Sequence, residues 1–131
     1  MKKLHNKSIL LIDDDAGMLR ALDKVLSAEG AVVASAPWAG DAIEILTERQ
    51  RRIDLVVTDL RMPFLTGLTV VYAIHEIFPE LPVIVLTAFD SPDVKTECLR
   101  QGAVAFLEKP LNTGQLLDAV EEALASQKAD S

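Results

Sequence analysis

Short apolar runs alternate with longer amphipathic stretches along the whole chain. Five runs are rich in Val, Ile and Leu, namely Ile9–Ile12, Ala31–Ala34, Asp54–Val57, Val83–Leu86 and Val104–Leu107. Runs of this length and composition predict strands that are buried on both faces, as the strands of a parallel sheet are.

Between these runs, apolar side chains recur with the period of an α-helix. Four stripes have this spacing: Met18, Leu19, Leu22, Val25 and Leu26; Ala39, Ala42, Ile43 and Leu46; Val70, Val71, Ile74, Ile77 and Phe78; and Leu116, Leu117, Val120, Ala123 and Leu124. Each stripe predicts a helix with one buried face. A weaker stripe near Ser91–Gln101 offers only Val94, Cys98 and Leu99 among charged residues. We expect that helix to be the most weakly anchored one.

Cap residues stand where these helices should begin and end. Gly30 and Gly102 suit helix C-caps, and Ser91–Pro92 suits an N-cap followed by proline at the first helical position. Asn112 with Gln115 resembles a capping box at the start of the last helix. Five strand–helix units result, which predicts a single α/β domain over residues 1–131 with a core from about 8 to 125 and a polar tail at 126–131.

Composition and charge exclude several kinds of protein. One cysteine in 131 residues cannot form an internal disulfide, and two histidines with one cysteine cannot build a structural zinc site, so we expect a reducing, cytoplasmic compartment. The net charge of −7 disfavours nucleic acid and anionic membranes as partners of this domain. The apolar runs are too short to span a bilayer, and the basic start lacks the pattern of a signal peptide.

Polar residues follow the predicted strands at their carboxyl ends, where open parallel sheets bind ligands. Acids follow the first and third runs, a hydroxyl ends the fourth, and an ammonium follows the fifth. These residues are Asp13, Asp14, Asp15, Asp59, Thr87 and Lys109.

This set of groups suits one kind of chemistry. Oxygen ligands alone select a hard cation, and Mg²⁺ keeps coordination places for water and a phosphoryl oxygen. A carboxylate such as Asp59 beside that ion can attack a phosphoryl group. Lys109 and Thr87 can then supply positive charge and a hydrogen-bond donor. The pattern predicts phosphoryl transfer to an aspartate.

Five segments carry a resemblance to a known family: Ile12-Asp13-Asp14, Asp54–Asp59, Met62-Pro63 with Gly67, Leu86-Thr87-Ala88 and Glu108-Lys109-Pro110. In these segments and over nearly the whole chain, the sequence resembles the receiver domain of two-component response regulators. Each segment is a weak signal alone, but all five in order form a specific signature. The resemblance implies a flavodoxin-like (βα)5 three-layer sandwich with a doubly wound five-stranded parallel sheet in the order 2-1-3-4-5.

The resemblance also implies a metal site and a phosphoacceptor. Asp59 would accept the phosphoryl group. Asp14, Asp59 and the backbone carbonyl of Arg61 would bind Mg²⁺ directly, and Asp13 would act through water.

Three further residues have roles by the same resemblance. Thr87 and Lys109 would contact the phosphoryl group, and Lys109–Pro110 is often a cis bond in the family. Thr87 would move towards the phosphoryl group, and the ring of Phe106, at the aromatic switch position, would fill the space that it leaves.

The partners implied are those of the family. A sensor histidine kinase or a histidine phosphotransfer protein would donate the phosphoryl group. The fourth helix, fifth strand and fifth helix would form the face that controls an output partner or effector domain, and that face could also form a homodimer. The chain would be a signalling switch that catalyses only its own phosphorylation and dephosphorylation.

The chain departs from the family pattern at a few positions. Thr66 stands where an acid often precedes Gly67, and Phe89 lies two residues after Thr87. In the family that the sequence resembles, this position borders the path of the water that hydrolyses the phosphoryl bond, so we hypothesise that Phe89 lengthens the lifetime of the phosphorylated state.

Several of these residues also have simpler interpretations. Asp15 suits the N-cap of the first helix better than a ligand. Cys98 suits a small apolar contact, His75 suits an exposed surface, and Trp38 suits packing at the entrance of the second helix.

Three other classes of protein fit the sequence less well. A haloacid-dehalogenase-like phosphatase needs a second acid two residues after its nucleophile, where this chain has Arg61. A flavodoxin-like electron carrier needs a phosphate-binding loop where this chain has Asp13–Asp15, whose charges would repel the FMN phosphate. A purely structural interaction domain gives no reason for the acidic edge.

Overall fold

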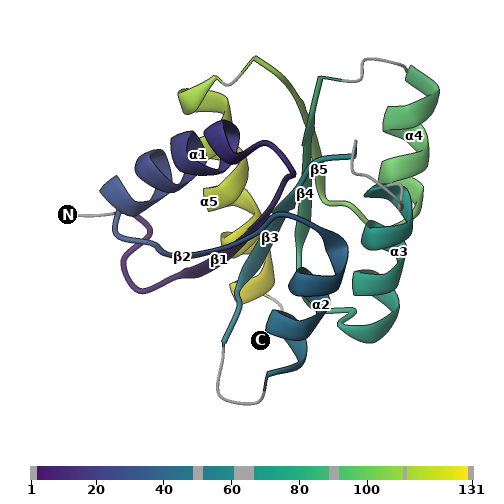
Figure 1. The fold of residues 1–131 in the computed structure, drawn as a ribbon, viewed down its shortest axis with the longest axis horizontal. Coiled ribbons are helices and arrows are strands. Elements are labelled where there is room, and N and C mark those ends of the chain that lie inside the picture. The colour runs from purple at the N-terminus through teal and green to yellow at the C-terminus, as the bar shows by residue number, and fades with distance from the viewer. Residues whose placement is uncertain (1–2, 49–51, 61–66, 89–91, 111, 130–131) are drawn as a thin grey trace.

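Five parallel strands form one sheet between two layers of helices (Figure 1). The computed structural model describes residues 3–48, 52–60, 67–88, 92–110 and 112–129. The strands are β1 (Ser8–Ile12), β2 (Val32–Ala36), β3 (Leu55–Thr58), β4 (Val83–Thr87) and β5 (Ala105–Glu108). Their order in the sheet is β2-β1-β3-β4-β5. This confirms the predicted fold class and strand order.

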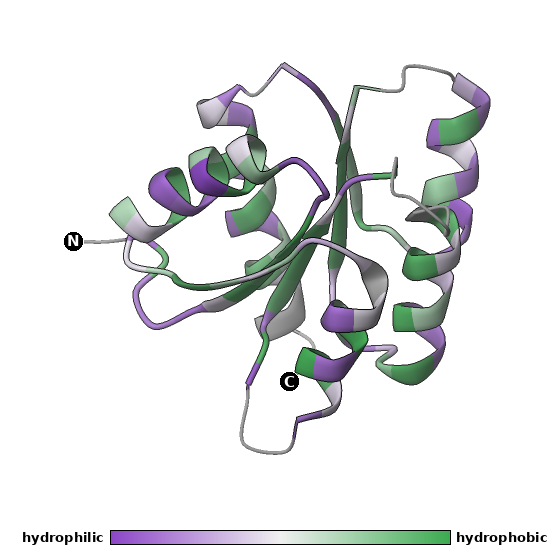
Figure 2. Ribbon diagram, in the orientation of Figure 1, coloured by the Kyte–Doolittle hydropathy of each residue, from purple (hydrophilic) through white to green (hydrophobic). Residues whose placement is uncertain are grey.

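The helices cover both faces of the sheet. They are α1 (Ala16–Ala28), α2 (Ala39–Thr47), α3 (Gly67–Ile77), α4 (Pro92–Arg100) and α5 (Thr113–Ala129). α1 and α5 pack on one face, and α2, α3 and α4 pack on the other. Figure 2 shows the consequence: the strands are mostly hydrophobic, while the helices carry hydrophilic residues between the hydrophobic ones. Among the described helices, none is both long enough and apolar enough to span a membrane.

Alternation along each strand divides the core in two. Ile9 and Leu11 of β1 face α1 and α5, whereas Leu10 and Ile12 face α2, α3 and α4. All four side chains are buried. β3 and β4 are buried throughout in the same way.

The prediction of strands buried on both faces is wrong for β2 and β5. Val32 at the start of β2 is 59% exposed, and β5 is only half-buried along most of its length. Both strands lie at the edges of the sheet, where one side has no neighbouring strand, and the local sequence does not reveal that position. The two strands also begin later than the predicted Ala31–Ala34 and Val104–Leu107, by one residue each.

The predicted N-caps of α1 and α5 are present. Asp15 Oδ1 accepts hydrogen bonds from the backbone N–H of Gly17 at 2.9 Å and of Met18 at 3.2 Å. Asn112 Oδ1 accepts one from the N–H of Gln115 at 3.0 Å. α4 begins at Pro92 as expected, whereas Ser91 lies outside the described residues.

α5 continues past the predicted end of the core at residue 125. The helix runs to Ala129, so most of the predicted tail at 126–131 is helical. Ala, Gln and Lys in this stretch favour a helix without needing an apolar face to bury. The predicted boundary reflected the loss of apolar side chains and not the end of the helix.

α4 is weakly anchored, as its sequence predicts. Of its side chains only Cys98 is buried, while Leu99 is 43% exposed. Burial raises the pKa of the Cys98 thiol, with a smaller contribution from the charge of Glu97. The thiol therefore remains protonated at neutral pH and acts as a small apolar contact.

The C-terminal end of α4 rests on α3 through a histidine and a glycine. Gly102 has a φ of +117°, a conformation that favours glycine. A Cβ atom built there would lie 2.6 Å from Cγ of His75. His75 is exposed, as expected, but its ring packs directly on Gly102.

Replacing Gly102 by alanine should lower the free energy of unfolding by about 2 kcal/mol, because the new Cβ meets the imidazole and the backbone is strained. Urea denaturation measures the change. Adding His75→Ala should recover only the part that comes from the contact. Gly114→Ala is the matched control, since its Cβ would meet only Asn112 Oδ1 at an ordinary 3.5 Å. Equal stabilities of the Gly102→Ala and Gly114→Ala variants would contradict the prediction.

Candidate functional site

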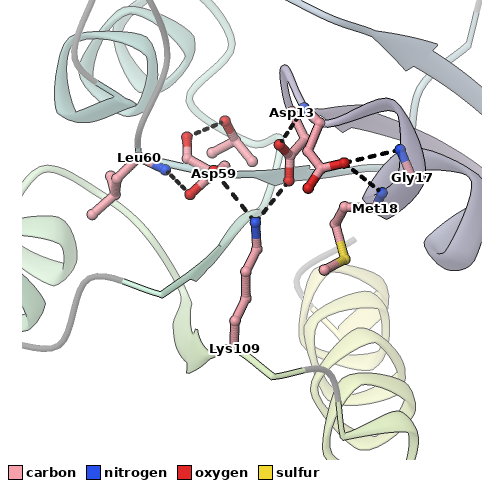
Figure 3. A network of polar contacts seen from close by, with 8 residues as sticks. Asp13, Gly17, Met18, Asp59, Leu60 and Lys109 are labelled. Atoms are coloured by element: carbon pink, nitrogen blue, oxygen red, sulfur yellow. Dashed lines mark hydrogen bonds and ion pairs between the residues drawn. The ribbon is translucent and has the colours of Figure 1, made fainter.

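Three charged side chains extend the strand alternation past the carboxyl edge of the sheet. Asp13, Asp59 and Lys109 each lie two residues beyond a strand residue whose side chain faces α1 and α5. Those strand residues are Leu11, Val57 and Leu107. Because β1, β3 and β5 are parallel, the three charged side chains reach the same edge on the same side. They point towards one another in Figure 3.

One ammonium bridges two carboxylates at this edge. Lys109 Nζ donates to Asp13 Oδ2 at 3.0 Å and lies 3.4 Å from Asp59 Oδ2. The second oxygen of each acid accepts a backbone hydrogen bond: Asp59 Oδ1 from the N–H of Leu60 at 2.7 Å, and Asp13 Oδ1 from the N–H of Asp15 at 2.9 Å. These contacts fix the orientation of both carboxylates.

A third acid completes the cluster. Asp13, Asp14 and Asp59 each offer a carboxylate oxygen, and the three atoms lie within 4.8 Å of one another. Asp13 and Asp59 are buried, whereas Asp14 is exposed. A purely oxygen donor set of this size, open to solvent at Asp14, suits a hard divalent cation with several water ligands.

The charges of the cluster are incompletely balanced by the protein. Burial raises the pKa of Asp13, although the N–H of Asp15 and the ammonium of Lys109 act in the opposite direction. Burial alone would lower the pKa of Lys109, but the hydrogen bond and charge of Asp13, followed by those of Asp59, raise it above its ordinary value. Lys109 is therefore charged at neutral pH, yet it does not fully offset the cost of ionised Asp13. A bound cation would supply the missing positive charge.

Thr87 and Phe106 lie on β4 and β5, the two strands next to β3 on the side of the sheet order away from β1. Thr87 is buried at the end of β4, two residues after Val85, so strand alternation directs its side chain to the same side as Val85, which packs against α2, α3 and α4. Phe106 of β5 is in register with Val85, so it is a diagonal neighbour of Thr87. The carbonyl of Thr87 accepts a hydrogen bond from the N–H of Lys109 at 2.8 Å, and the Lys109–Pro110 bond is cis. The backbone thus joins this pair to the charged cluster.

Some predicted residues lie outside the described part of the chain. They are Arg61, Met62, Pro63, Thr66 and Phe89. The predicted carbonyl ligand and the predicted shield of the phosphoryl bond therefore stay predictions.

The backbone N–H groups of Leu60 and Asp15 are the contributors that the sequence did not indicate. Each donates to a site carboxylate. A backbone donor leaves no trace in residue type, so only its place directly after a strand-end acid could have suggested it.

Comparison with known proteins gives a consistent result. A family model described as the response regulator receiver domain matches residues 9–121. The transcriptional regulatory protein GlrR of Escherichia coli K12 is 35% identical over 116 residues, which is 88% of this chain and 26% of that protein. The DNA-binding transcriptional regulator NtrC of Proteus hauseri is 31% identical over 121 residues, 92% of this chain and 25% of that protein. This chain spans about a quarter of the length of these relatives.

Solved structures agree with the sequence relatives. A response regulator receiver domain protein from Clostridium thermocellum superposes with a TM-score of 0.89 and 31% identity, over 95% of this chain and 99% of that one. A CheY-like receiver domain protein from Methanospirillum hungatei also has a TM-score of 0.89, with 28% identity over 96% and 99% of the two chains.

Proposed function

This chain belongs to the response regulator receiver domain family, a signalling domain of two-component systems, and we propose that its Asp59 accepts a phosphoryl group from a phosphohistidine. The observation that carries the proposal is the single ammonium of Lys109 between the carboxylates of Asp13 and Asp59. The donor would be a sensor histidine kinase or a histidine phosphotransfer protein. The reaction would be the chain's own phosphorylation and dephosphorylation, with no other substrate.

The residues suit an in-line transfer. A carboxylate oxygen of Asp59 attacks phosphorus, the P–N bond of the donor breaks, and its electron pair returns to the imidazole. The N–H of Leu60 holds Oδ1 of Asp59 in place at 2.7 Å. Lys109 lies beside Oδ2, where it meets the negative charge of the arriving phosphoryl oxygens.

The acid cluster fits Mg²⁺. Asp14 and Asp59 would hold the ion directly, Asp13 would hold it through water, and the carbonyl of Arg61 is the third proposed direct ligand. The close approach of the three carboxylates and the raised pKa of Asp13 support this assignment. When bound, Mg²⁺ would neutralise charge on the carboxylates and on the phosphoryl oxygens.

Switching would follow from Thr87 and Phe106. A phosphoryl group on Asp59 attracts the Thr87 hydroxyl, and the half-buried ring of Phe106 then fills the space that Thr87 leaves. α4 packs beside β5 and is held by one buried side chain, so it is free to follow at low cost. The face formed by α4, β5 and α5 would carry the change to a partner or to a second copy.

The whole protein would be a regulator with an output beyond this domain. GlrR and NtrC are named as transcriptional regulators, and the matched part is about a quarter of each. Residues 1–131 would form one receiver domain, with a core from about 8 to 125. Its net charge of −7 disfavours direct binding to DNA, which would fall to another domain.

Incubation with acetyl phosphate tests the proposal. With Mg²⁺, intact mass should increase by one phosphoryl group that is stable in acid and labile in base; with EDTA the gain should disappear. Inorganic phosphate with Mg²⁺ is the control and should give no gain. A gain that does not depend on Mg²⁺ would contradict the metal assignment, and no gain under any condition would contradict phosphorylation of this site.

A further inference from the structure

Among the described residues, one large exposed apolar side chain lies at the edge of the sheet that carries the acid cluster. The six exposed large apolar residues are Val32, Trp38, Tyr72, Ile77, Leu99 and Val104. Val32 and Val104 lie at the amino ends of strands, Ile77 and Leu99 at the C-terminal ends of helices that return to that same amino edge, and Tyr72 in the middle of α3. Trp38 instead follows the carboxyl end of β2.

A short series of contacts connects Trp38 to the proposed phosphoacceptor. The carboxylates of Asp59 and Asp13 offer oxygens within 4.8 Å of each other. The N–H of Asp13 donates to the carbonyl of Ala36 at 3.2 Å, and Trp38 is two residues further along the chain.

The ring of Trp38 is held in place although it is 55% exposed. Trp38 occupies the N-cap position of α2, where its side chain makes no capping hydrogen bond. Its ring lies over Gly40 instead, since a Cβ atom built on Gly40 would be 3.1 Å from Cζ3 and 3.2 Å from Cη2 of Trp38. The prediction that Trp38 packs at the entrance of α2 is correct for this contact, yet more than half of the side chain remains available to a partner.

We propose that Trp38 is an anchor for the protein that donates the phosphoryl group, outside the pocket in which the chemistry takes place. The inference rests on the proposed function. Asp59 is only 6% exposed, so a donor histidine reaches it only when the donor protein covers this edge of the sheet. A standard interface buries roughly 800 Å² on each partner, so the donor protein must also contact residues around the pocket, and Trp38 follows β2 at this same edge.

The composition of the edge favours this role. The other exposed and described residues near the acid cluster are acidic or small, as Asp14, Asp15, Ala88 and Pro110 are. An interface with a protein needs an apolar centre, and tryptophan is enriched among the residues that dominate binding energy. Because the ring already packs against Gly40, binding a partner has to order less of this side chain than it would for a tryptophan without such a contact.

Comparison of two phosphoryl donors tests the anchor. In Trp38→Ala, kcat/KM for transfer from a phosphorylated sensor kinase should fall roughly 30-fold, mainly through KM. The kinase is the one, among those of the chain's own genome, that phosphorylates the wild type fastest. The rate with acetyl phosphate and Mg²⁺ should stay within about twofold, because Trp38 is not among the described hydrogen-bond partners of Asp13, Asp59 and Lys109. Ile77→Ala, equally exposed at 55% but at the amino edge, is the control and should change neither rate.

Each other outcome has a defined meaning. Equal loss with both donors would show that Trp38 shapes the pocket, and no loss with either would show that it is not a contact; both overturn the anchor. A wild type that accepts from acetyl phosphate but from no kinase also overturns it, while leaving phosphorylation of Asp59 intact. A wild type that accepts from neither donor overturns the proposed function itself.

A spectroscopic measurement gives an independent answer. The chain has one tryptophan, so labelling with 5-fluorotryptophan places a single ¹⁹F resonance at Trp38. Addition of the unlabelled kinase should shift or broaden this resonance, whereas acetyl phosphate with Mg²⁺ should change it far less. A resonance that is unchanged at saturating kinase would overturn the anchor.

Discussion

Asp59→Asn should reduce phosphoryl incorporation from acetyl phosphate by roughly a thousandfold or more, to below detection, because an amide cannot serve as the nucleophile. The fold should be retained. Asparagine keeps the shape of aspartate and the Oδ1 acceptor that binds the N–H of Leu60. It also removes one of three crowded carboxylates, so the free energy of unfolding in metal-free buffer should not fall. Intact mass and urea denaturation of the same preparation measure both effects.

The matched control for this variant is Asp15→Asn. Asp15 is an acid at the same edge, but its carboxylate caps α1, a role that asparagine fills equally well. Incorporation should therefore equal that of the wild type. A phosphoryl group that still appears on Asp59→Asn would place the acceptor elsewhere. Loss of incorporation in both variants would show that removing any negative charge from this edge lowers incorporation, so the loss in Asp59→Asn would not identify the nucleophile.

The sequence predicted the interior of the sheet well and its edges poorly. β1, β3 and β4 are buried on both faces, and their continuous apolar runs predict that burial directly. β2 and β5 carry similar runs but lie at the edges, and their exposure depends on strand order, which is a property of the whole chain. Helix caps were predictable because Asp15 and Asn112 act on residues two or three positions away.

In the candidate site too, features set by local sequence were predictable and features set by the whole fold were not. The acids, Thr87 and Lys109 could be placed at one edge from their positions after the strands. The sequence does not predict which acid Lys109 binds more closely, since contacts between residues 96 and 50 positions apart depend on the register of β1, β3 and β5. The contact of the Trp38 ring with Gly40 was equally difficult to predict from the sequence, because it depends on the absence of a side chain at Gly40.

Lys109→Met should lower the free energy of unfolding by about 3 kcal/mol at pH 7 in metal-free buffer, because it leaves two buried carboxylates without their cation. The raised pKa of Lys109 means that its ammonium stabilises the fold at every pH below its ordinary pKa, so the full contribution is present at pH 7. The loss should shrink as pH falls towards the raised pKa of Asp13, since protonated Asp13 no longer needs the cation. Mg²⁺ should restore part of the stability at pH 7, and phosphorylation by acetyl phosphate should still be about a hundredfold slower.

Lys3→Met separates this effect from the loss of any lysine. Lys3 lies 3.6 Å from Glu121, but its side chain is 63% exposed, so its removal should change stability by no more than about 0.5 kcal/mol. Urea denaturation of both variants at pH 7 and pH 5, with EDTA or with Mg²⁺, gives the comparison. Equal losses in the two variants would mean that water already screens the carboxylates, and the argument for a cation at this edge would fail. A loss confined to Lys109→Met that Mg²⁺ partly reverses would instead mean that ammonium and metal neutralise the same charges, so that the pocket is built for a second cation as well as for a phosphoryl group.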